Sequence, residues 1–468
     1  MVIFGVSGDL TRRKLVPALF DLYQAGFLPD RFTVLGYARR DWSAQDMVRE
    51  VGGTLAERAD IDQSKLKKFF AHFEYQRGNF DNPTDYDSLA AKLQELDDAT
   101  SQCGRRLFYL ATPAHSYESI LAGINRAKLE VPCGEDESWT RIVIEKPFGH
   151  DLISSQTLDK QLTDIFTEDQ IYRIDHYLAK ETAQNIMTFR FANAIFEPIW
   201  NAEHIDRIEI TVQEEIGIGT RGNFYDKTGA LRDVVQNHLL QLLALVTMDQ
   251  PTAPTGDSFR DARAKLLSSI CCFDLNHVGR NLALGQYAGY RKEADVSPDS
   301  NTETFAAVRV DITTPRWQGV PVFLVTGKRM AKAMTRITIE FKSVDKGVYD
   351  LPVDHKRNVL TFDIQPQEGI GLQLLAKQPG YGHTIQPVSM HFNYAENFQN
   401  ERIDAYTRLL LDAIDGDQTL FTRSDEVAAE WRFIDPIIER IQAIKLHPQI
   451  YPDGSDGPSG LSTIIKGH

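Results

Sequence analysis

The sequence lacks an excess of positive charge. Its 468 residues include 51 Lys and Arg against 65 Asp and Glu, which gives a formal net charge of −14. Nonspecific binding to nucleic acid requires basic surface that displaces counterions from phosphates, and adsorption on anionic membranes requires basic segments. We therefore expect neither nucleic acid nor a membrane among the partners of this chain.

Long hydrophobic runs are also missing. The longest strongly apolar stretch runs from Leu239 to Met248, is interrupted by Gln241 and is followed by Asp249. A membrane-spanning helix needs about 20 apolar residues, so none is expected. The first residues, Met-Val-Ile-Phe-Gly, have neither the charged start nor the long apolar core of a secretory signal. These absences favour a cytoplasmic protein.

Cysteine is scarce. The four cysteines, Cys103, Cys133, Cys271 and Cys272, are too few for a disulfide framework in a chain of this length. Neither a Cys-x-x-Cys nor a His-x-x-x-His pair accompanies them, so we expect no metal site. We expect Cys271 and Cys272 to lie in a helix that begins near Asp257.

The remaining composition is that of an ordinary globular protein with a large core, because 42% of the residues are hydrophobic and 25% are charged. The length corresponds to two or three domains at roughly 150 residues each. Two patterns along the chain indicate two domains of different class.

The first pattern is an alternation of short apolar strands with helix-like segments, and it continues from the N-terminus to about Asp175. Strands are predicted at 2–4, 32–36, 107–111, 142–144 and 171–174, and helices at 85–96 and 117–129. Strands that are apolar throughout are typical of a parallel sheet covered by helices on both faces. We therefore predict an α/β, Rossmann-like coenzyme-binding domain over residues 1–174.

The second pattern begins near residue 205, where apolar and polar residues alternate with period two. Such segments lie at 208–213, 337–341, 360–364 and 388–392, and helix-periodic stretches lie at 179–191, 229–248, 257–272, 401–414 and 425–444. Alternation of this kind is typical of antiparallel strands with one apolar face. We predict a larger α+β domain with a mainly antiparallel sheet over residues 175–468, which serves substrate binding and dimerisation.

A glycine-containing turn follows the first predicted strand. The segment reads Gly5-Val6-Ser7-Gly8-Asp9-Leu10. Two glycines three positions apart allow a tight turn and let backbone amides approach a pyrophosphate at the next helix N-terminus. The spacing differs from the commoner Gly-x-Gly-x-x-Gly, and a plain strand-to-helix turn is the alternative. The strand before the turn and the apolar-periodic helix after it favour coenzyme binding by Gly5, Ser7, Gly8, Asp9 and Leu10.

Two arginines, Arg39 and Arg40, follow the second predicted strand. An NAD enzyme usually places an acidic residue there, on the ribose 2′-hydroxyl, whereas arginines suit a 2′-phosphate. The pair therefore favours NADP. The alternative is that both arginines are solvated surface residues. Asp41, which follows them, could bind a ribose 2′-hydroxyl, so NAD also stays possible as the coenzyme.

A polar segment, Asp175-His176-Tyr177-Leu178-Ala179-Lys180-Glu181, follows the strand predicted at 171–174. We expect a helix to begin there, and a helix N-terminus offers unbonded amides to a phosphate. His176 and Lys180, four residues apart, would then project to one side of the helix. An Asp N-cap with solvated neighbours explains the same spacing.

These residues also carry a family resemblance. The segment Arg173 to Glu181 closely resembles the signature of glucose-6-phosphate dehydrogenases, with Ala179 where Gly is usual. The resemblance extends over almost the whole chain, since further segments match at Gly5–Leu10, Glu145–Gly149, Asp233–His238, Arg316–Pro321 and Gly327–Arg329. The nine-residue signature is highly specific, whereas the glycine turn is not.

The resemblance implies oxidation of D-glucose 6-phosphate at C1 to 6-phospho-D-glucono-1,5-lactone, with hydride transfer to NADP+. This reaction is the first step of the oxidative pentose phosphate pathway. The family's general base corresponds to His238, and Asp175 corresponds to the carboxylate that orients it. Without the resemblance, His238 would be assigned to the core, because it shares a helical stripe with Leu231, Val235 and Leu242.

The resemblance also implies the substrate contacts. The residues that match the family's substrate site are Lys146, His176, Tyr177, Lys180, Glu214, Asp233, Lys328 and Gln365. Lys146 would contact both substrate and coenzyme, and the bond before Pro147 is a candidate for the cis form. Ala333 stands where a further basic residue is common, so a role for the adjacent Lys332 stays open.

The resemblance implies a homodimer, with a homotetramer as a further assembly, and the large predicted sheet would supply the interface. Two other functions stay open. One is a different two-domain sugar oxidoreductase, whose substrate would carry no phosphate. The other is a non-catalytic NADP-sensing protein, which would need the glycine turn and the arginines but no base.

Overall fold

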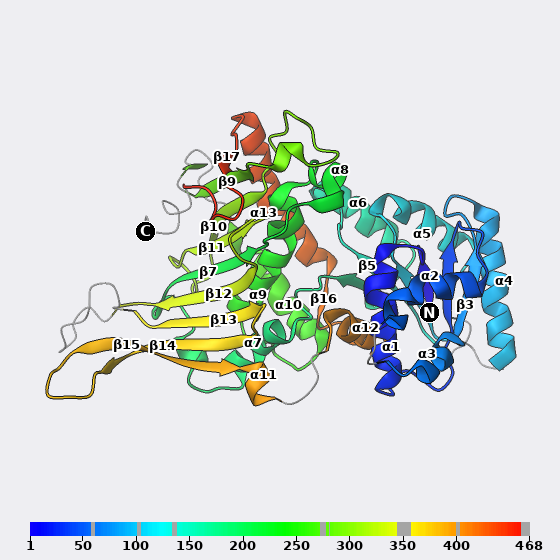
Figure 1. Cartoon of the computed structure of the whole chain (residues 1–468), viewed down its shortest axis with the longest axis horizontal. Coiled ribbons are helices and arrows are strands. Elements are labelled where there is room, and N and C mark those ends of the chain that lie inside the picture. The colour runs from blue at the N-terminus through cyan, green and yellow to red at the C-terminus, as the bar shows by residue number, and fades with distance from the viewer. Residues whose placement is uncertain are drawn as a thin grey trace. The chain divides into compact units, whose positions relative to one another are not determined.

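The computed structural model describes residues 1–57, 61–100, 104–132, 138–271, 278–279, 281–343, 357–398 and 403–459 (Figure 1). The chain forms two compact units. Unit 1 consists of Met1–Ala179, Thr255–Arg260 and Ile403–Ser424, and unit 2 of Lys180–Pro254, Asp261–Arg402 and Asp425–His468. The predicted domain boundary follows residue 174, whereas the first segment of unit 1 ends at Ala179, and two later segments also belong to unit 1.

Unit 1 contains a seven-stranded sheet. Its strands are β1 (Val2–Phe4), β2 (Val34–Ala38), β3 (Phe73–Arg77), β4 (Arg106–Leu110), β5 (Thr140–Glu145), β6 (Ile171–Ile174) and β16 (Phe421–Thr422). Their order is β16-β6-β5-β4-β1-β2-β3. All neighbours pair in parallel except β16, which is antiparallel to β6. The first six strands have the Rossmann order, so the predicted fold of this domain is confirmed.

The order of the strands reverses between β1 and β4. The chain progresses from β1 through β2 to β3 on one side and from β4 through β5 to β6 on the other. In sheets of this kind ligands bind outside the carboxyl ends of the strands at the point of reversal. The helices of unit 1 are α1 (Val16–Gln24), α2 (Ala44–Ala56), α3 (Gln63–Phe70), α4 (Pro83–Thr100), α5 (Tyr117–Arg126), α6 (Leu152–Thr163) and α12 (Ala405–Asp415).

The helix after the glycine turn starts with a wide turn. Residues Thr11–Leu15 are π-helical, and the α-helical part begins at Val16 with Pro17 in its first turn. Proline has no backbone N–H and cannot donate to the residue four positions earlier, which favours a fresh helical start at this point. The chain nevertheless stays helical from Asp9 to Gln24, and Pro17 lies just after the π-helical turn.

The late segment 403–424 joins unit 1 through contacts that are remote in sequence. Lys14 Nζ lies 2.9 Å from Asp404, at the start of α12. At the end of α12, Arg141 donates to the carbonyl oxygens of Ala413 and Ile414 at 2.8 and 2.7 Å. Strand β16 then extends the sheet by two residues beside β6. These few contacts explain why a late segment belongs to the early unit.

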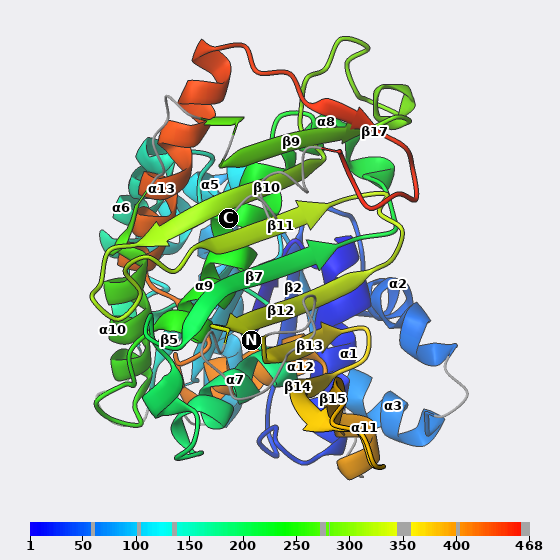
Figure 2. The same ribbon diagram turned by 90° about the vertical axis from the view of Figure 1, so that its left-hand side faces the viewer.

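Unit 2 contains a ten-stranded sheet, which Figure 2 shows face on. Its strands are β7 (Ile205–Gln213), β8 (Ile270–Cys271), β9 (Leu282–Tyr287), β10 (Phe305–Ile312), β11 (Val322–Gly327), β12 (Met334–Phe341), β13 (Val359–Gln365), β14 (Gly369–Lys377), β15 (Ile385–Asn393) and β17 (Gln449–Tyr451). The order is β15-β14-β13-β12-β7-β11-β10-β9-β17, and β8 pairs with β10. Among the described strands, only the pairs β7–β11 and β9–β17 are parallel, so the predicted mainly antiparallel sheet is confirmed.

The helices of unit 2 include α7 (Glu181–Phe191), α8 (Gly222–Tyr225), α9 (Leu240–Thr247), α11 (Tyr394–Asn397) and α13 (Ser424–Ala443). Helix α10 (Gly256–Leu267) begins in unit 1 and ends in unit 2. A π-helical segment, Leu231–Leu239, runs directly into α9 and contacts β7 and β11. Among the described residues, no helix has both the length and the apolar character needed to cross a bilayer.

The prediction for Cys271 is wrong. Helix α10 ends at Leu267, and Cys271 lies half-buried on strand β8, where it pairs with Asp311 of β10. The apolar spacing after Asp257 continues past the helix because β8 is also partly buried, so periodicity alone does not mark the change. Cys103, Cys133 and Cys272 lie outside the described residues.

Candidate active site

The carboxyl edge of the unit 1 sheet gathers most of the predicted coenzyme residues. The glycine turn follows β1, Arg39 and Arg40 follow β2, and Lys146 follows β5. Parallel strands end at the same edge, so these segments lie along one side of the sheet. The topology therefore brings together segments that are far apart in the sequence.

The glycine turn has the geometry of a dinucleotide cradle. Gly5 has φ +80, and a Cβ at this position would lie 2.6 Å from the carbonyl oxygen of Ala111, which follows β4. The Gly8 N–H donates to the Gly5 carbonyl at 2.8 Å and closes the turn. Only glycine fits a backbone that is both left-handed and this close to the next strand. The turn thus fits a pyrophosphate at the start of the following helix.

The two arginines after β2 are exposed. Within the described residues, Arg39 and Arg40 have no carboxylate at ion-pair distance, and the Arg40 guanidinium lies 5.2 Å from the centre of the Trp42 ring. Asp41, the residue that would suit NAD, is paired with Arg77 at 3.2 Å. Arg77 ends β3 and adds a third cation to this edge, which the sequence analysis did not identify.

The Glu-Lys-Pro segment follows β5, and its Lys146–Pro147 peptide bond is cis, as predicted. Tyr109 donates to the Glu145 carboxylate at 2.5 Å, and Tyr117 donates to the Glu145 backbone carbonyl at 2.8 Å. Burial raises the pKa of Glu145 to about 7, although the Tyr109 hydrogen bond and the Lys146 charge act in the opposite direction. These tyrosines fix the backbone that carries Lys146.

The segment after β6 forms a turn before its helix starts, which corrects the expected helix. Helix α7 begins at Glu181 with Lys180 as its N-cap, so His176 and Lys180 do not share a helical face. The buried Asp175 carboxylate instead accepts the Tyr177 N–H at 3.0 Å. A side chain that bonds the backbone two residues on stabilises a turn rather than a helix. The ring of His176 stacks on Tyr406 with centroids 6.3 Å apart.

His238 lies in unit 2, on the π-helical segment Leu231–Leu239. Its side chain is 3% exposed, and Asp233 on the same segment is 7% exposed. Such wide turns are rare in proteins and frequently occur at functional sites. The segment 229–248 was predicted as one ordinary helix, whereas the structure divides it into a π-helical part and α9.

The C-terminal end of α9 is bonded by three large buried side chains. Trp200 and Trp317 each donate an indole N–H at 2.7 Å, to the carbonyls of Val246 and Thr247 respectively. Arg190 donates to the carbonyls of Leu245 and Met248 at 3.1 and 2.8 Å. A helix leaves its last four carbonyls without intrahelical partners, and here side chains satisfy them. This end of the helix is therefore fixed in position.

A buried polar cluster connects the π-helical segment and the start of α9 to α13. Gln241 donates to Glu430 at 2.7 Å and to Glu426 at 3.3 Å, both on α13. Gln236 donates to Glu430 at 3.2 Å. Arg263 binds Glu426 through two nitrogens, at 2.8 and 3.3 Å, and both side chains are fully buried. We call Arg263, Glu426, Glu430, Gln236 and Gln241 the polar cluster.

Lys328 joins two of the predicted substrate carboxylates. Its ammonium group is hydrogen-bonded to Glu214 and lies 3.8 Å from Asp233. The side chain is 3% exposed, and its nitrogen lies 5.2 Å from the centre of the Tyr225 ring. Tyr451 donates to the Lys328 backbone carbonyl at 2.6 Å. Lys328 thus forms one cluster with Glu214 and Asp233 at the ends of β7 and β11, although both carboxylates lie far earlier in the chain.

The remaining predicted substrate residues of unit 2 also meet. Lys180 donates to the exposed Gln365 side chain at 2.5 Å. Gln365 ends β13, which explains how a residue 185 positions later reaches the start of α7. Lys332, whose role was left open, is exposed in the turn before β12.

A Rossmann unit with a dinucleotide cradle, followed by a unit that buries a histidine and an aspartate on one π-helical segment, is typical of a nicotinamide-dependent oxidoreductase. The family model described as "Glucose-6-phosphate dehydrogenase, NAD binding domain" matches residues 2–185, and that of the C-terminal domain matches residues 187–468. The chain belongs to the glucose-6-phosphate dehydrogenase family.

Relatives cover the chain over its full length. Glucose-6-phosphate 1-dehydrogenase of Chlamydia pneumoniae is 41% identical over 100% of this chain and 94% of its own. The enzyme of the same name from Aggregatibacter actinomycetemcomitans is 42% identical over 99% of this chain and 95% of its own. A solved glucose-6-phosphate dehydrogenase in complex with its substrate glucose-6-phosphate has a TM-score of 0.92 and 34% identity, and covers 100% of this chain and 96% of its own.

Proposed function

We propose that this protein oxidises D-glucose 6-phosphate at C1 to 6-phospho-D-glucono-1,5-lactone and transfers the hydride to NADP+. The observation that carries the proposal is the signature Arg173–Glu181, together with the full-length relationship to enzymes of that name. The reaction would open the oxidative pentose phosphate pathway. Bound NADP would supply the hydride acceptor.

The coenzyme would lie along the carboxyl edge of the unit 1 sheet. Backbone amides of the turn from Gly5 to Leu10 would hold the pyrophosphate, because the left-handed Gly5 brings the backbone close to it. Arg39 and Arg40, exposed and with no carboxylate at ion-pair distance among the described residues, would bind the 2′-phosphate. Lys146 would contact both coenzyme and substrate.

In the chemical step His238 would accept the proton of the C1 hydroxyl, which must leave as the hydride departs. Asp175 would orient the imidazole and stabilise its protonated form. Glu214 and Asp233 would accept hydrogen bonds from sugar hydroxyls, with their geometry held by Lys328. The phosphate would be bound by His176, Tyr177 and Lys180, with Lys328 nearby, and Gln365 would contribute to the contacts with the sugar hydroxyls.

Replacing both arginines tests the coenzyme assignment. We expect Arg39→Ala with Arg40→Ala to weaken NADP binding by about one to two orders of magnitude, because charge-assisted contacts to the 2′-phosphate are lost. NAD binding should change little. Fluorescence titration with both coenzymes measures the ratio, and Arg49→Ala with Arg126→Ala, two exposed arginines of α2 and α5, is the control. An equal loss of affinity for NADP and NAD would show that Arg39 and Arg40 are surface charges that do not recognise the 2′-phosphate.

The substrate assignment is tested against a phosphate-free sugar. We expect kcat/KM for glucose 6-phosphate to exceed that for free glucose by about 100-fold, since the phosphate makes charge-assisted contacts that glucose lacks. Reduced coenzyme formed with each sugar gives the ratio. Comparable values would favour a different sugar oxidoreductase, and no turnover of either sugar would favour a non-catalytic coenzyme sensor.

We further propose a cytoplasmic homodimer, with pairing of dimers to a tetramer as a further assembly. The support is the outer part of the unit 2 sheet, where β14 and β15 pair along their length and carry exposed apolar side chains such as Val388 and Met390. Figure 2 shows no described helix of unit 2 in front of strands β10, β11, β7 and β12. Away from the strand ends, the partly exposed residues that alternate with the buried ones on β7 and β12 are polar and include the ion pair between Arg207 and Glu340, so an interface at this face would be polar near its centre, with exposed apolar side chains on β15.

A further inference from the structure

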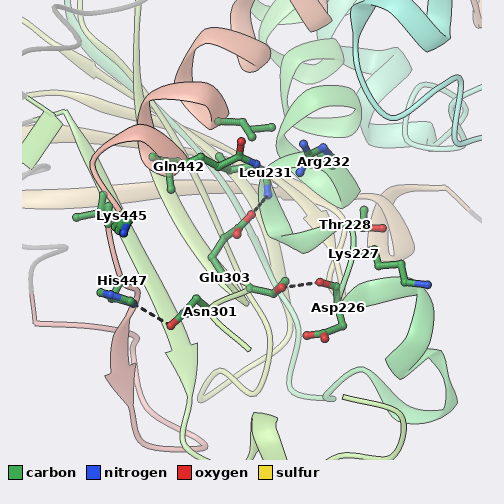
Figure 3. A pocket seen from close by; sticks show the side chains of 14 residues that line it. Asp226, Lys227, Thr228, Leu231, Arg232, Asn301, Glu303, Gln442, Lys445 and His447 are labelled. Carbon is green, nitrogen blue, oxygen red and sulfur yellow. Dashed lines mark hydrogen bonds between the residues drawn. The ribbon is translucent and has the colours of Figure 1, made fainter. Parts of the chain in front are cut away.

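A cavity of about 460 Å³ lies in unit 2, and Lys328, Glu214 and Asp233 are not among the residues that line it (Figure 3). It is formed where the loop after α8, the start of the π-helical segment, the strand connection before β10 and the end of α13 meet. Its floor is aliphatic, with Leu231 and Ile438 buried and Ile441 and Leu446 half-buried. Such a floor can accept the apolar part of a small molecule.

The rim of the cavity is basic. Lys227 and Lys445, both exposed, come from opposite sides, and neither has a carboxylate at ion-pair distance among the described residues. Arg232 and His447 also line the cavity, and His447 is held by Asn301 through a ring nitrogen at 2.9 Å. In a protein of net charge −14, cations gathered beside an apolar floor favour an anionic ligand.

The two acidic residues of the lining are occupied by protein partners. Asp226 accepts hydrogen bonds from the hydroxyls of Tyr290 and Ser300, at 2.9 and 2.5 Å. Glu303 accepts the Leu231 N–H at 3.1 Å (Figure 3). Burial raises the pKa of the Glu303 carboxyl above its usual range, against the opposing effect of Arg232. Lys227, Arg232 and Lys445 outnumber these two carboxylates, so the lining keeps a positive balance of formal charge.

The cavity is connected to the candidate active site through one helix. Leu231 and Arg232 line the cavity, and Asp233 follows them directly on the π-helical segment that also carries His238. Glu303 fixes the first turn of this segment through the Leu231 N–H. Gly229, which precedes the segment, leaves space for the Glu303 carboxylate, because a Cβ at this position would lie 2.3 Å from it. A ligand that contacts Leu231 and Arg232 therefore contacts the first turn of the π-helical segment that carries Asp233 and His238.

We propose that this cavity binds a small amphipathic anion, with its phosphate or carboxylate between Lys227, Arg232 and Lys445 and its apolar part on Leu231 and Ile438. Occupancy adjusts the position of Asp233 and so the affinity for the sugar substrate. The proposed binding of the anion depends on the cavity alone, whereas its effect on the affinity for the sugar substrate rests on the proposed function. The ligand chemistry fits two sources, an alkyl phosphate or carboxylate and a nucleoside monophosphate.

Calorimetric titration of the full chain with octyl phosphate and, separately, AMP tests the proposal. Saturating NADP is present throughout, so that neither probe reports the coenzyme site. We expect at least one probe to bind in the micromolar to low millimolar range. Lys445→Glu should weaken that binding by about tenfold, through charge reversal at the rim. Gln442→Trp should weaken it by occupying the cavity without changing its charge.

The matched control is Lys292→Glu, which reverses the charge of an exposed lysine of the same unit outside the cavity and should leave probe binding unchanged. Absence of binding by both probes, or equal binding by Lys445→Glu and the wild type, would overturn the site. The bound probe should also change KM for glucose 6-phosphate at least twofold while kcat changes less. Binding with an unaltered KM would overturn the coupling, and absence of turnover without the probe would count against the proposed function instead.

Discussion

His238→Asn is expected to lower kcat by about three to four orders of magnitude while leaving NADP binding intact. Asparagine is smaller than histidine and can keep a hydrogen bond, but it cannot take up a proton near neutral pH, so the general-base contribution is lost. The coenzyme residues lie in unit 1, on other segments of the chain, so their contacts should not change. Steady-state kinetics and coenzyme titration measure the two effects separately.

The control for this variant is His204→Asn, because His204 is an exposed histidine of the same unit, 3.1 Å from Asn201. It should retain wild-type kcat. Unchanged turnover in His238→Asn would show that another group accepts the proton.

Arg263→Met is expected to lower the free energy of unfolding by about 3–5 kcal/mol. The substitution keeps the volume but leaves the Glu426 carboxylate without its bidentate partner in a fully buried position, and an uncompensated buried charge is strongly destabilising. Glu426 also accepts from Gln241 of α9, which directly continues the segment that carries the proposed base His238, so kcat should fall together with stability. Chemical denaturation of the purified variant measures the first effect.

The double variant Arg263→Met with Glu426→Leu distinguishes the cause. Removing both charges of a buried pair is often neutral or stabilising, so much of the lost stability should return. Lys265→Met, which removes an exposed cation of the same helix that is paired with Asp249, should cost less than about 1 kcal/mol. If the double variant is no more stable than Arg263→Met, the loss arises from packing around Arg263 rather than from the unpaired carboxylate.

Much of the fold could be predicted from the sequence because its strongest signals are local. The apolar strands at 2–4 and 142–144 and the alternation at 337–341 and 360–364 correspond to β1, β5, β12 and β13. Strand β16 and its place in unit 1 could not be predicted, because so short a strand has no periodicity and its partner β6 lies far earlier in the chain. Cys271 was placed wrongly because the half-buried apolar residues Ile270 and Cys271 of β8 continue the apolar spacing of α10, which hides the end of the helix.

The candidate site was predicted where its residues are contiguous in the sequence. The segments around Gly5, Lys146 and Asp175 were identified as motifs, although the helix after Asp175 starts later than expected because the Asp175 carboxylate stabilises a turn. The polar cluster and the pairing of Lys328 with Glu214 were not foreseen. Their partners lie far apart in the sequence, and only the folded chain brings them together.

The most direct test of the central claim follows the hydrogen on C1 of the sugar. With glucose 6-phosphate deuterated at C1 and NADP+ as acceptor, the proposed reaction moves deuterium to the reduced nicotinamide and leaves a lactone without it. We expect mass spectrometry to find one deuterium in the reduced coenzyme and none in the product. Reduced coenzyme without deuterium, or a sugar product that retains it, would contradict oxidation at C1.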